Sequence, residues 1–472
     1  MERSMPVPIM VIVTLALLAP LLLGAFVARP ARTILPLYAV SLPIASVITL
    51  RVPFPQPFNT LSTALGGVAI AAIVVHVLIF GRGRIPTIPV ALWMLFMGWL
   101  LLTILWALDP EDAVNRATIA LPLVVLTIAV GILPVDRGDL ELNRLAIIAS
   151  GAAVGAYALF LLVTGQALPA HGAAMTERFS IASAPGEADP NILAASLLLP
   201  VALSAERMLV GGSLWLTPRT WRKIGLLGLL LTGIAIVLTG SRGGTIAGGL
   251  AFVLTMVLCY RVPEGRERVR STIRGLAVGA CVILLAGILF RGLFPGGISQ
   301  LPAVRDRVRL VQDVANRLVN VENRGSNRLD IWAGGLAACR LHCGTGAGIG
   351  NFEQTYTDLF AFSGAEVNVG LDRPAHNAYL EVAVEAGIVG LTLLLLALLA
   401  EWFALSRRPV FLTSPALGAA LASVVFAEVF LSALWFKFFW LALVFVRLTE
   451  NAVEPIEDAV PQDVLAAADR QW

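Results

Sequence analysis

Charged residues are scarce in this chain: only 14% of its 472 residues are Asp, Glu, Lys or Arg, whereas 58% are hydrophobic. Soluble globular domains carry about a quarter charged residues, so the composition excludes an ordinary soluble fold. The mean hydropathy of +0.84 indicates a chain that lies mostly in lipid. A bilayer span needs about 20 apolar residues, and such runs recur along the sequence.

Cysteine and histidine are also sparse, with four of each. Four cysteines are too few for a disulfide scaffold. No pair of histidines has a zinc-binding spacing such as H-E-x-x-H, so we expect neither a metal nor a cofactor. Cys339 and Cys343 lie in a polar stretch, where they could form a small disulfide in an oxidising compartment or remain free structural residues.

Thirteen apolar runs are candidate membrane spans, and the last two could form one hairpin. They predict an all-α polytopic membrane protein with about 12–13 transmembrane helices. The first run is interrupted at Pro20, so it could instead be a signal-like segment or an incomplete crossing. The runs cover residues 8–27, 33–50, 61–80, 88–107, 117–133, 144–164, 191–209, 223–240, 243–260, 274–293, 377–402, 412–433 and 435–447.

Arginine and lysine are distributed unevenly between the connecting loops. One alternate set of loops holds most of them, and the positive-inside rule places that set in the cytoplasm. The opposite set, which includes the long segment 294–376, then faces outward. The basic set comprises Arg82, Arg84, Arg137, Arg144, Arg207, Arg219, Arg222, Lys223, Arg261, Arg266, Arg268, Arg270, Arg274, Arg407 and Arg408.

This topology divides the chain into four parts. We expect an N-terminal transmembrane bundle at 1–293, a large helical periplasmic loop at 294–376, C-terminal transmembrane helices at 377–447 and a cytoplasmic tail at 448–472. No internal repeat of fixed period is visible.

Polar residues gather where apolar runs begin on the outer side. Asp189 and Asn191 precede one run, where helix capping is their ordinary role. Ser241 and Arg242 precede another run and are followed by two glycines. Arg242 could simply extend to the membrane interface. The shortness of the turn instead predicts that its guanidinium is held against the bundle, beside helix-start amides that can bind an anion.

The long outer segment, together with Arg291 just before it, carries nine arginines and no lysine. Arginine is preferred where a planar fork grips phosphate or carboxylate oxygens. Residues 303–320 have the apolar spacing of an amphipathic helix, on which most arginines would form a solvated face. Arg328 falls in the first turn of the next predicted helix, where the helix dipole disfavours a cation. Residues 344–352, "GTGAGIGNF", form a Gly-rich turn but not a dinucleotide fingerprint, because no strand precedes them.

The stretch "LDRPAHNAYLEVAVEAGIVG" places His376 directly before an apolar helix. A lone histidine is often a satisfied hydrogen-bonding residue. However, His376 can titrate near neutral pH and lies where a water-filled site could meet the lipid. Asn377 can cap the helix. Glu381 and Glu385 follow inside the apolar run, where a carboxylate is costly unless paired, so we expect arginine partners for them.

The stretch "RPAHNAYLEVAVEAGIVGL" resembles the signature of the O-antigen ligase and polymerase superfamily. In that signature a His-Asn pair opens a span, and a glycine, here Gly387, follows after ten residues. The patches "DPNILA", "TGSRGG", "NRLDIW" and "GTGAGIGNF" are similar to the other recurring patches of the family, and the resemblance covers about residues 180–400. It implies a polytopic enzyme of about twelve spans with a large periplasmic loop.

The resemblance also implies a reaction. Members transfer a glycan from an undecaprenyl-pyrophosphate carrier to an acceptor sugar, without a nucleotide donor or an essential metal. Carried over by position, His376 is the expected catalytic base, and Arg242 and Arg328 are expected to bind the donor pyrophosphate. Arg373 joins them on physical grounds, as a neighbouring cation. The expected supporting residues are Asn377, Asn191, Asp189, Glu381 and Glu385.

We therefore expect a metal-independent inverting glycosyltransferase in the bacterial inner membrane, with its active site facing the periplasm. The expected function is that of an O-antigen ligase acting on lipid A-core in lipopolysaccharide biosynthesis. An O-antigen or exopolysaccharide polymerase, which takes another glycan acceptor, is the alternative that the motifs do not separate. A transporter or lipid flippase is disfavoured, because the polar clusters gather at one face and no repeat is visible. Membrane lipids are expected partners and nucleic acid is not.

Overall fold

The structure is a computed structural model that describes residues 22–44, 60–81, 83, 85–164, 170–171, 177–181, 189–212, 215–293, 328–363, 374–406, 414–432 and 434–452. These residues are helical apart from turns and one antiparallel pair of two-residue strands, β1 (Ala170–His171) and β2 (Glu177–Arg178). The predicted helix at 303–320, Arg373 and the tail beyond residue 452 lie outside the described residues.

Eight helical segments of the described chain are long and apolar enough to cross a membrane, which confirms the predicted all-α membrane fold. Each coincides with a predicted apolar run, and one of them is broken into two helices at Leu197. They are α3 (Leu61–Phe80), α4 with η2 (Ile88–Trp106), α5 (Pro110–Gly131), α6 (Arg137–Thr164), α7 with α8 (Pro190–Ser196 and Leu198–Leu209), α9 (Pro218–Leu238), α10 (Arg242–Tyr260) and α15 (Ala378–Ser406).

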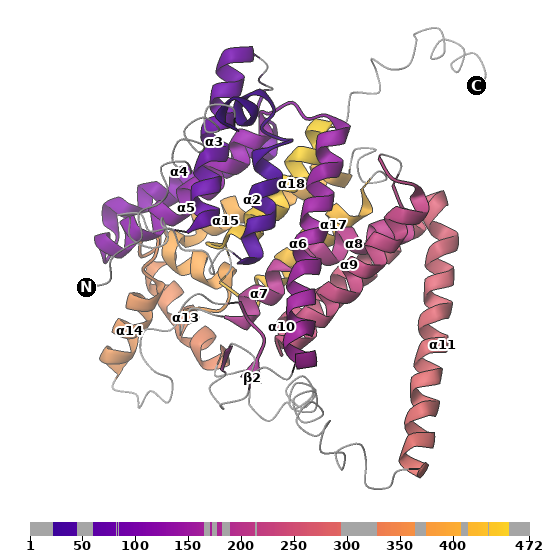
Figure 1. Cartoon of the computed structure of the whole chain (residues 1–472). Helices are drawn as coiled ribbons and strands as arrows, with labels where there is room; N and C mark the ends of the chain where they lie inside the picture. The colour runs from indigo at the N-terminus through magenta and orange to yellow at the C-terminus, as the bar shows by residue number, and fades with distance from the viewer. Residues whose placement is uncertain are drawn as a thin grey trace, which may run out of the picture.

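The remaining helices complete the bundle or lie beside it. In Figure 1, α11 stands apart from the bundle at the right, whereas α13 and α14 (orange) lie at the lower left. The predicted runs at 412–433 and 435–447 become two shorter helices. These further elements are α2 (Ile34–Ser41), η1 (Leu42–Ile44), α11 (Pro263–Leu293), α13 (Arg328–His342), α14 (Phe352–Ser363), α17 (Pro415–Ala427) and α18 (Lys437–Ala452).

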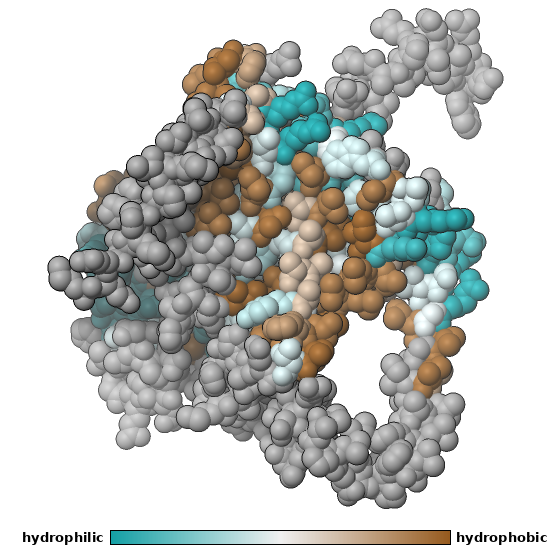
Figure 2. Space-filling view, viewed as in Figure 1, coloured by the Kyte–Doolittle hydropathy of each residue, from teal (hydrophilic) through white to brown (hydrophobic). Residues whose placement is uncertain are grey.

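Apolar side chains cover the middle of the bundle, as expected for a surface that faces lipid. Figure 2 shows hydrophobic residues across the centre of the visible face and hydrophilic residues along its upper edge and at the right, where α9 and α11 begin. Leu78 and Ile79 of α3 are largely exposed. At the centre, by contrast, Leu197, Leu198 and Leu203 of the α7–α8 segment are fully buried. This segment is therefore the core around which the other spans pack.

Three buried arginines of the bundle are paired with glutamates. Arg207 of α8 contacts Glu141 of α6 at 2.6 Å, and Arg144 contacts the same glutamate at 2.8 Å. Arg447 of α18 pairs with Glu401 of α15. Arg144 and Arg207 are buried within helices, so the prediction that they are loop cations was wrong. The pairing of Arg207 with Glu141 depends on contact between α8 and α6, which the local sequence does not show.

A sharp bend in α15 accommodates the Gly-rich segment. Gly387 has φ +66° and ψ −169° inside this helix, a backbone conformation that is essentially restricted to glycine. Residues 344–352 lie against the bend, and two of their amides donate to the carbonyls of Val384 and Glu385 at 2.9 Å. The segment "GTGAGIGNF" is therefore a structural turn. This agrees with the sequence analysis, which rejected a dinucleotide-binding fingerprint because no strand precedes the segment.

Replacing Gly387 by alanine should destabilise the protein strongly. A Cβ at this position would lie 2.3 Å from the carbonyl oxygen of Gly344, and the backbone conformation alone costs a non-glycine residue about 1–3 kcal/mol. Thermal unfolding of the purified protein measures the effect. Gly249→Ala in α10 is the matched control, because a Cβ there meets no atom within 4 Å. Equal unfolding midpoints for the two variants would contradict the account of the bend.

Candidate functional site

The predicted site residues lie at the starts of four helices. Asp189 caps α7, and Arg242 is the first residue of α10. Arg328 is the first residue of α13, and Asn377 directly precedes α15. A helix N-terminus presents unpaired amides and a partial positive charge. Any place where several of these starts meet is therefore favourable for an anion.

The starts of α7 and α10 are in close contact. A Cβ on Gly244 would lie 2.3 Å from the Cβ of Ala194 in α7, so only glycine permits this approach. The Ser241 hydroxyl accepts a hydrogen bond from the Gly244 amide at 3.1 Å and caps the helix. Gly244 thus allows the first turns of α7 and α10 to pack closely.

Arg328 shares its electrostatic environment with Arg242 and Asp189. Burial lowers the pKa of the Arg328 guanidinium, the positive charge of Arg242 lowers it further, and the carboxylate of Asp189 opposes both effects. The Nε atom of Arg328 is buried and has no hydrogen-bond partner among the described residues. The charges of Asp189 at the start of α7 and of Arg242 at the start of α10 therefore both influence the guanidinium at the start of α13.

One turn joins the start of α15 to the start of α10. The amide of Ala378 donates to the carbonyls of Glu428 and Leu431 at 2.9 and 3.1 Å. In the same turn, the Cβ of Phe430 lies 3.5 Å from where a Cβ on Gly243 would be. Residues 428–431 thus contact both helix starts.

A contact from α13 completes the cluster. The indole of Trp332 donates to the carbonyl of Ala375, the residue before His376, at 3.1 Å. Arg328 begins the same helix one turn earlier and interacts with Arg242. His376, Arg242 and Arg328, which are distant in sequence, therefore belong to one connected cluster of helix starts.

The backbone of His376 is strained. Its φ of +49° is one of two positive values among the non-glycine residues described, and such a conformation costs about 1–3 kcal/mol. The residue is half-buried. Asn377 confirms its predicted capping role, because its side-chain oxygen accepts from the amides of Tyr379 and Leu380, both at 3.1 Å. Strain of this kind is characteristic of functional positions.

Asp189 and Asn191 have structural contacts that position α7. Asp189 accepts from the Asn191 amide at 2.7 Å, which confirms the capping interpretation. The Asn191 side chain accepts from Arg178 at 3.1 Å, and Arg178 also donates to the carbonyl of Thr239 at 2.8 Å. Arg178 thus joins the start of α7 to the end of α9. Sequence reasoning missed this role, although Arg178 is one of few cations predicted on the outer side.

The exposure of the Arg242 side chain differs from what the sequence predicted. Its side chain is exposed rather than held against the bundle, because Gly243 and Gly244 provide the packed surface of this turn instead. As the first residue of α10, it projects at the end of the bundle. The location of Arg373 stays a prediction, since that residue lies outside the described ranges.

Glu381 and Glu385 are buried below His376 without an arginine partner. In the described part of the chain, neither forms an ion pair, so the expected arginine partners are not found among these residues. Glu381 accepts from the indole of Trp435 at 2.9 Å, and Glu385 accepts from the Phe352 amide at 3.2 Å. The guanidinium of Arg116 lies 5.7 Å from the Trp435 ring centroid. Among the described residues, neutral donors therefore hold these carboxyl groups.

Cys339 and Cys343 are both free thiols. Their Sγ atoms are 3.7 Å apart on one side of α13. Burial, together with the neighbouring thiol, raises the pKa of Cys339 to about 11. Of the two alternatives left open by the sequence, a disulfide or free structural cysteines, the structure shows free cysteines.

The fold and the site define a multi-pass membrane protein with a cationic, histidine-containing cluster at one end of its bundle. Residues 227–395 match the model of the family described as O-Antigen ligase, and no curated protein sequence matches the chain. The matched region contains α10, α13 and the first part of α15. It confirms the resemblance to the O-antigen ligase and polymerase superfamily, which implies glycosyltransferase activity on lipid-linked glycans.

The stability of the protein should depend on the hydrogen-bond acceptor of Glu385 and not on its negative charge. Glu385→Gln keeps an oxygen that can accept from the Phe352 amide, so its unfolding midpoint should stay near that of the wild type. Glu385→Ala leaves that buried amide without a partner, which costs about 1–3 kcal/mol. Thermal unfolding of both variants measures the difference. A glutamine variant that unfolds as readily as the alanine variant would show that the negative charge itself is required.

Proposed function

We propose that this protein is an O-antigen ligase, which transfers a glycan from undecaprenyl pyrophosphate to the lipid A-core acceptor at the periplasmic face of the inner membrane. The observation that supports this proposal best is the convergence of helix starts that carry Arg242, Arg328 and His376. In the proposed reaction a diphosphate leaves the sugar while the acceptor hydroxyl loses a proton. The arginines and helix starts can bind the diphosphate, and the His376 imidazole can take the proton.

The donor needs an apolar groove for its tail and fixed positive charge for its phosphates. Val237 near the end of α9 and Ile246 in the first turns of α10 supply exposed apolar side chains near the helix starts. Arg242 and Arg328 supply two guanidinium groups, which bind phosphate oxygens in a bidentate manner. The unpaired amides at the helix starts add partial positive charge. Together they bind the diphosphate and stabilise the negative charge that it gains as the sugar departs.

His376 acts as the general base for the acceptor. A hydroxyl oxygen of the acceptor attacks C1 of the sugar, and its proton passes to a ring nitrogen of neutral His376. The bond between C1 and the diphosphate oxygen breaks at the same time, and the diphosphate leaves with the bonding electron pair. Attack opposite the leaving group inverts the configuration at C1. Positive charge for the departing diphosphate comes from arginines, so the proposed reaction needs no metal.

The other predicted residues position these groups. Asn377 fixes the start of α15 and therefore the backbone of His376. Asp189 offsets part of the effect of burial on the Arg328 guanidinium and caps α7. Glu381 and Glu385 fix the helix below His376 through Trp435 and Phe352. Arg373 retains the role of an additional phosphate ligand, as proposed from the sequence.

Transfer assays with purified protein distinguish the ligase from the polymerase of the same superfamily. The donor is an undecaprenyl-pyrophosphate-linked glycan, and the acceptors are lipid A-core and a second lipid-linked glycan, supplied separately. Transfer to lipid A-core alone supports the ligase. Transfer to the lipid-linked glycan alone supports the polymerase, and transfer to neither acceptor contradicts the proposed chemistry.

His376→Asn should abolish transfer and leave the fold intact. Asparagine tolerates a positive φ, so the backbone at this position can keep its conformation, but its amide cannot accept the proton. The expected loss in rate is about 10²–10⁴-fold, with an unfolding midpoint close to that of the wild type. Transfer by this variant at the wild-type rate would remove the base assignment.

Arg242→Ala should impair use of the pyrophosphate donor more than Arg242→Lys. Loss of one preorganised donor costs about 10²–10³-fold in rate, whereas lysine retains the charge but not the planar fork. The kcat/KM for the donor measures both effects. Arg261→Ala, at the other end of α10, is the matched control and should behave as the wild type. Equal activity of both Arg242 variants with the wild type would rule out the phosphate role.

A further inference from the structure

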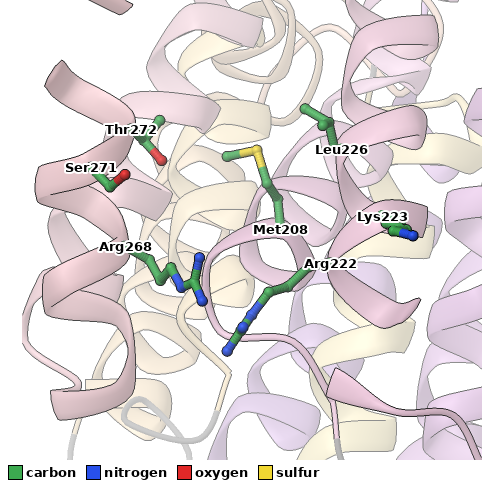
Figure 3. Close-up of a pocket in the computed structure, with 7 residues that line it drawn as sticks. All are labelled: Met208, Arg222, Lys223, Leu226, Arg268, Ser271 and Thr272. Atoms are coloured by element: carbon green, nitrogen blue, oxygen red, sulfur yellow. The ribbon is translucent and has the colours of Figure 1, made fainter. Parts of the chain in front are cut away.

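A second cationic cavity lies between α8, α9 and α11. Its volume is about 230 Å³, and Figure 3 shows the side chains that line it. Three of its seven lining residues are cations, two carry hydroxyl groups, and two are apolar. They are Arg222, Lys223, Arg268, Ser271, Thr272, Met208 and Leu226.

No acidic residue lines this cavity, although it concentrates positive charge. The guanidinium groups of Arg222 and Arg268 extend toward one another across the space between α9 and α11 (Figure 3). In the described part of the chain, neither forms an ion pair, and the buried Nε of Arg222 has no hydrogen-bond partner. Like charges at close range repel, so this arrangement favours an anion between them.

The buried arginines elsewhere in the bundle behave differently. Arg144, Arg207 and Arg447 each contact a glutamate within hydrogen-bonding reach. The protein thus supplies a carboxylate to these internal guanidinium groups. Arg222 is half-buried and Arg268 is exposed, and no described residue supplies a carboxylate to either, so both guanidinium groups are accessible to an anionic ligand.

The chemical character of the side chains that line the cavity indicates the class of ligand. The Ser271 and Thr272 hydroxyls can donate to oxygen atoms of an anion, and arginine binds phosphate oxygens in a bidentate manner. Met208 and Leu226 form an apolar wall above the charged groups (Figure 3). A phosphate group fits the polar part, and an acyl chain attached to it would continue along the apolar part.

This cavity is separate from the Arg242 cluster. Arg222 lies near the start of α9, and α10 with Arg242 begins just after α9 ends. A helix of 21 residues is about 30 Å long at 1.5 Å per residue, which is also the thickness of the hydrocarbon core. The two cationic sites therefore lie near opposite membrane surfaces, and the cavity is on the side to which the basic loops are assigned.

We propose that this cavity is a binding site for a phosphate-bearing anion at the cytoplasmic surface, with Arg222 and Arg268 as its principal ligands. The phosphate can belong to the headgroup of an anionic phospholipid or to a free anion. In either case it neutralises the two facing guanidinium groups and joins α11 to the bundle through α9. The proposal does not depend on the transfer reaction.

Binding to the full-length purified protein tests this inference. One arm adds dioleoyl phosphatidylglycerol in mixed micelles, and another adds inorganic phosphate at constant ionic strength. Lipid retention in native mass spectrometry and the shift in unfolding midpoint are measured. The double variant Arg222→Gln and Arg268→Gln is compared with the double variant Arg219→Gln and Arg274→Gln, which removes the same charge from exposed positions on the same two helices.

The cavity variant should bind at least about tenfold more weakly than the wild type, because two charge-assisted contacts are lost, whereas the exposed-position variant should bind normally. Without ligand, the cavity variant should unfold no earlier than the wild type, since like-charge repulsion is removed. Response to the lipid but not to inorganic phosphate identifies a headgroup site, and response to inorganic phosphate identifies a free-anion site. Equal loss in both variants, or no binding by the wild type, would overturn the proposal.

Discussion

The hydrogen bonds from the Ala378 amide to the carbonyls of Glu428 and Leu431 are the constraint on which the site depends. They anchor the start of α15 to a turn that also contacts Gly243 at the start of α10. Without these hydrogen bonds, the turn at residues 428–431 would no longer connect the helix start beside His376 with the helix start that carries Arg242. A few backbone contacts at helix starts thus bring together groups that are widely separated along the chain.

The electrostatic design of the bundle distinguishes its interior from its two ends. Inside, guanidinium groups are paired with glutamates, which is how a low-dielectric region tolerates charge. At the end that holds His376, the charges of Arg242 and Asp189 both influence Arg328, and several helix starts add positive potential. At the other end, Arg222 and Arg268 share a cavity with no acidic lining residue. Excess positive charge at both ends is consistent with substrates or lipids that carry phosphate.

Much of this arrangement could be predicted from the sequence, because its signals are local. Apolar runs define the spans, and capping residues such as Asp189 and Asn377 mark helix starts. Contacts between distant segments had no such signal. The pairing of Arg207 with Glu141, the link from Arg178 to Asn191 and the docking of the Gly-rich segment against Gly387 all depend on tertiary packing. The same reason explains why Glu381 and Glu385 were assigned arginine partners but are bound by Trp435 and Phe352.

A structure determined by electron cryomicroscopy in the presence of undecaprenyl pyrophosphate tests the central claim most directly. The account predicts diphosphate density in contact with the guanidinium groups of Arg242 and Arg328, with the His376 imidazole facing the position that a sugar would occupy. Diphosphate density bound elsewhere on the protein, with His376 separated from it by packed helices, would contradict the account.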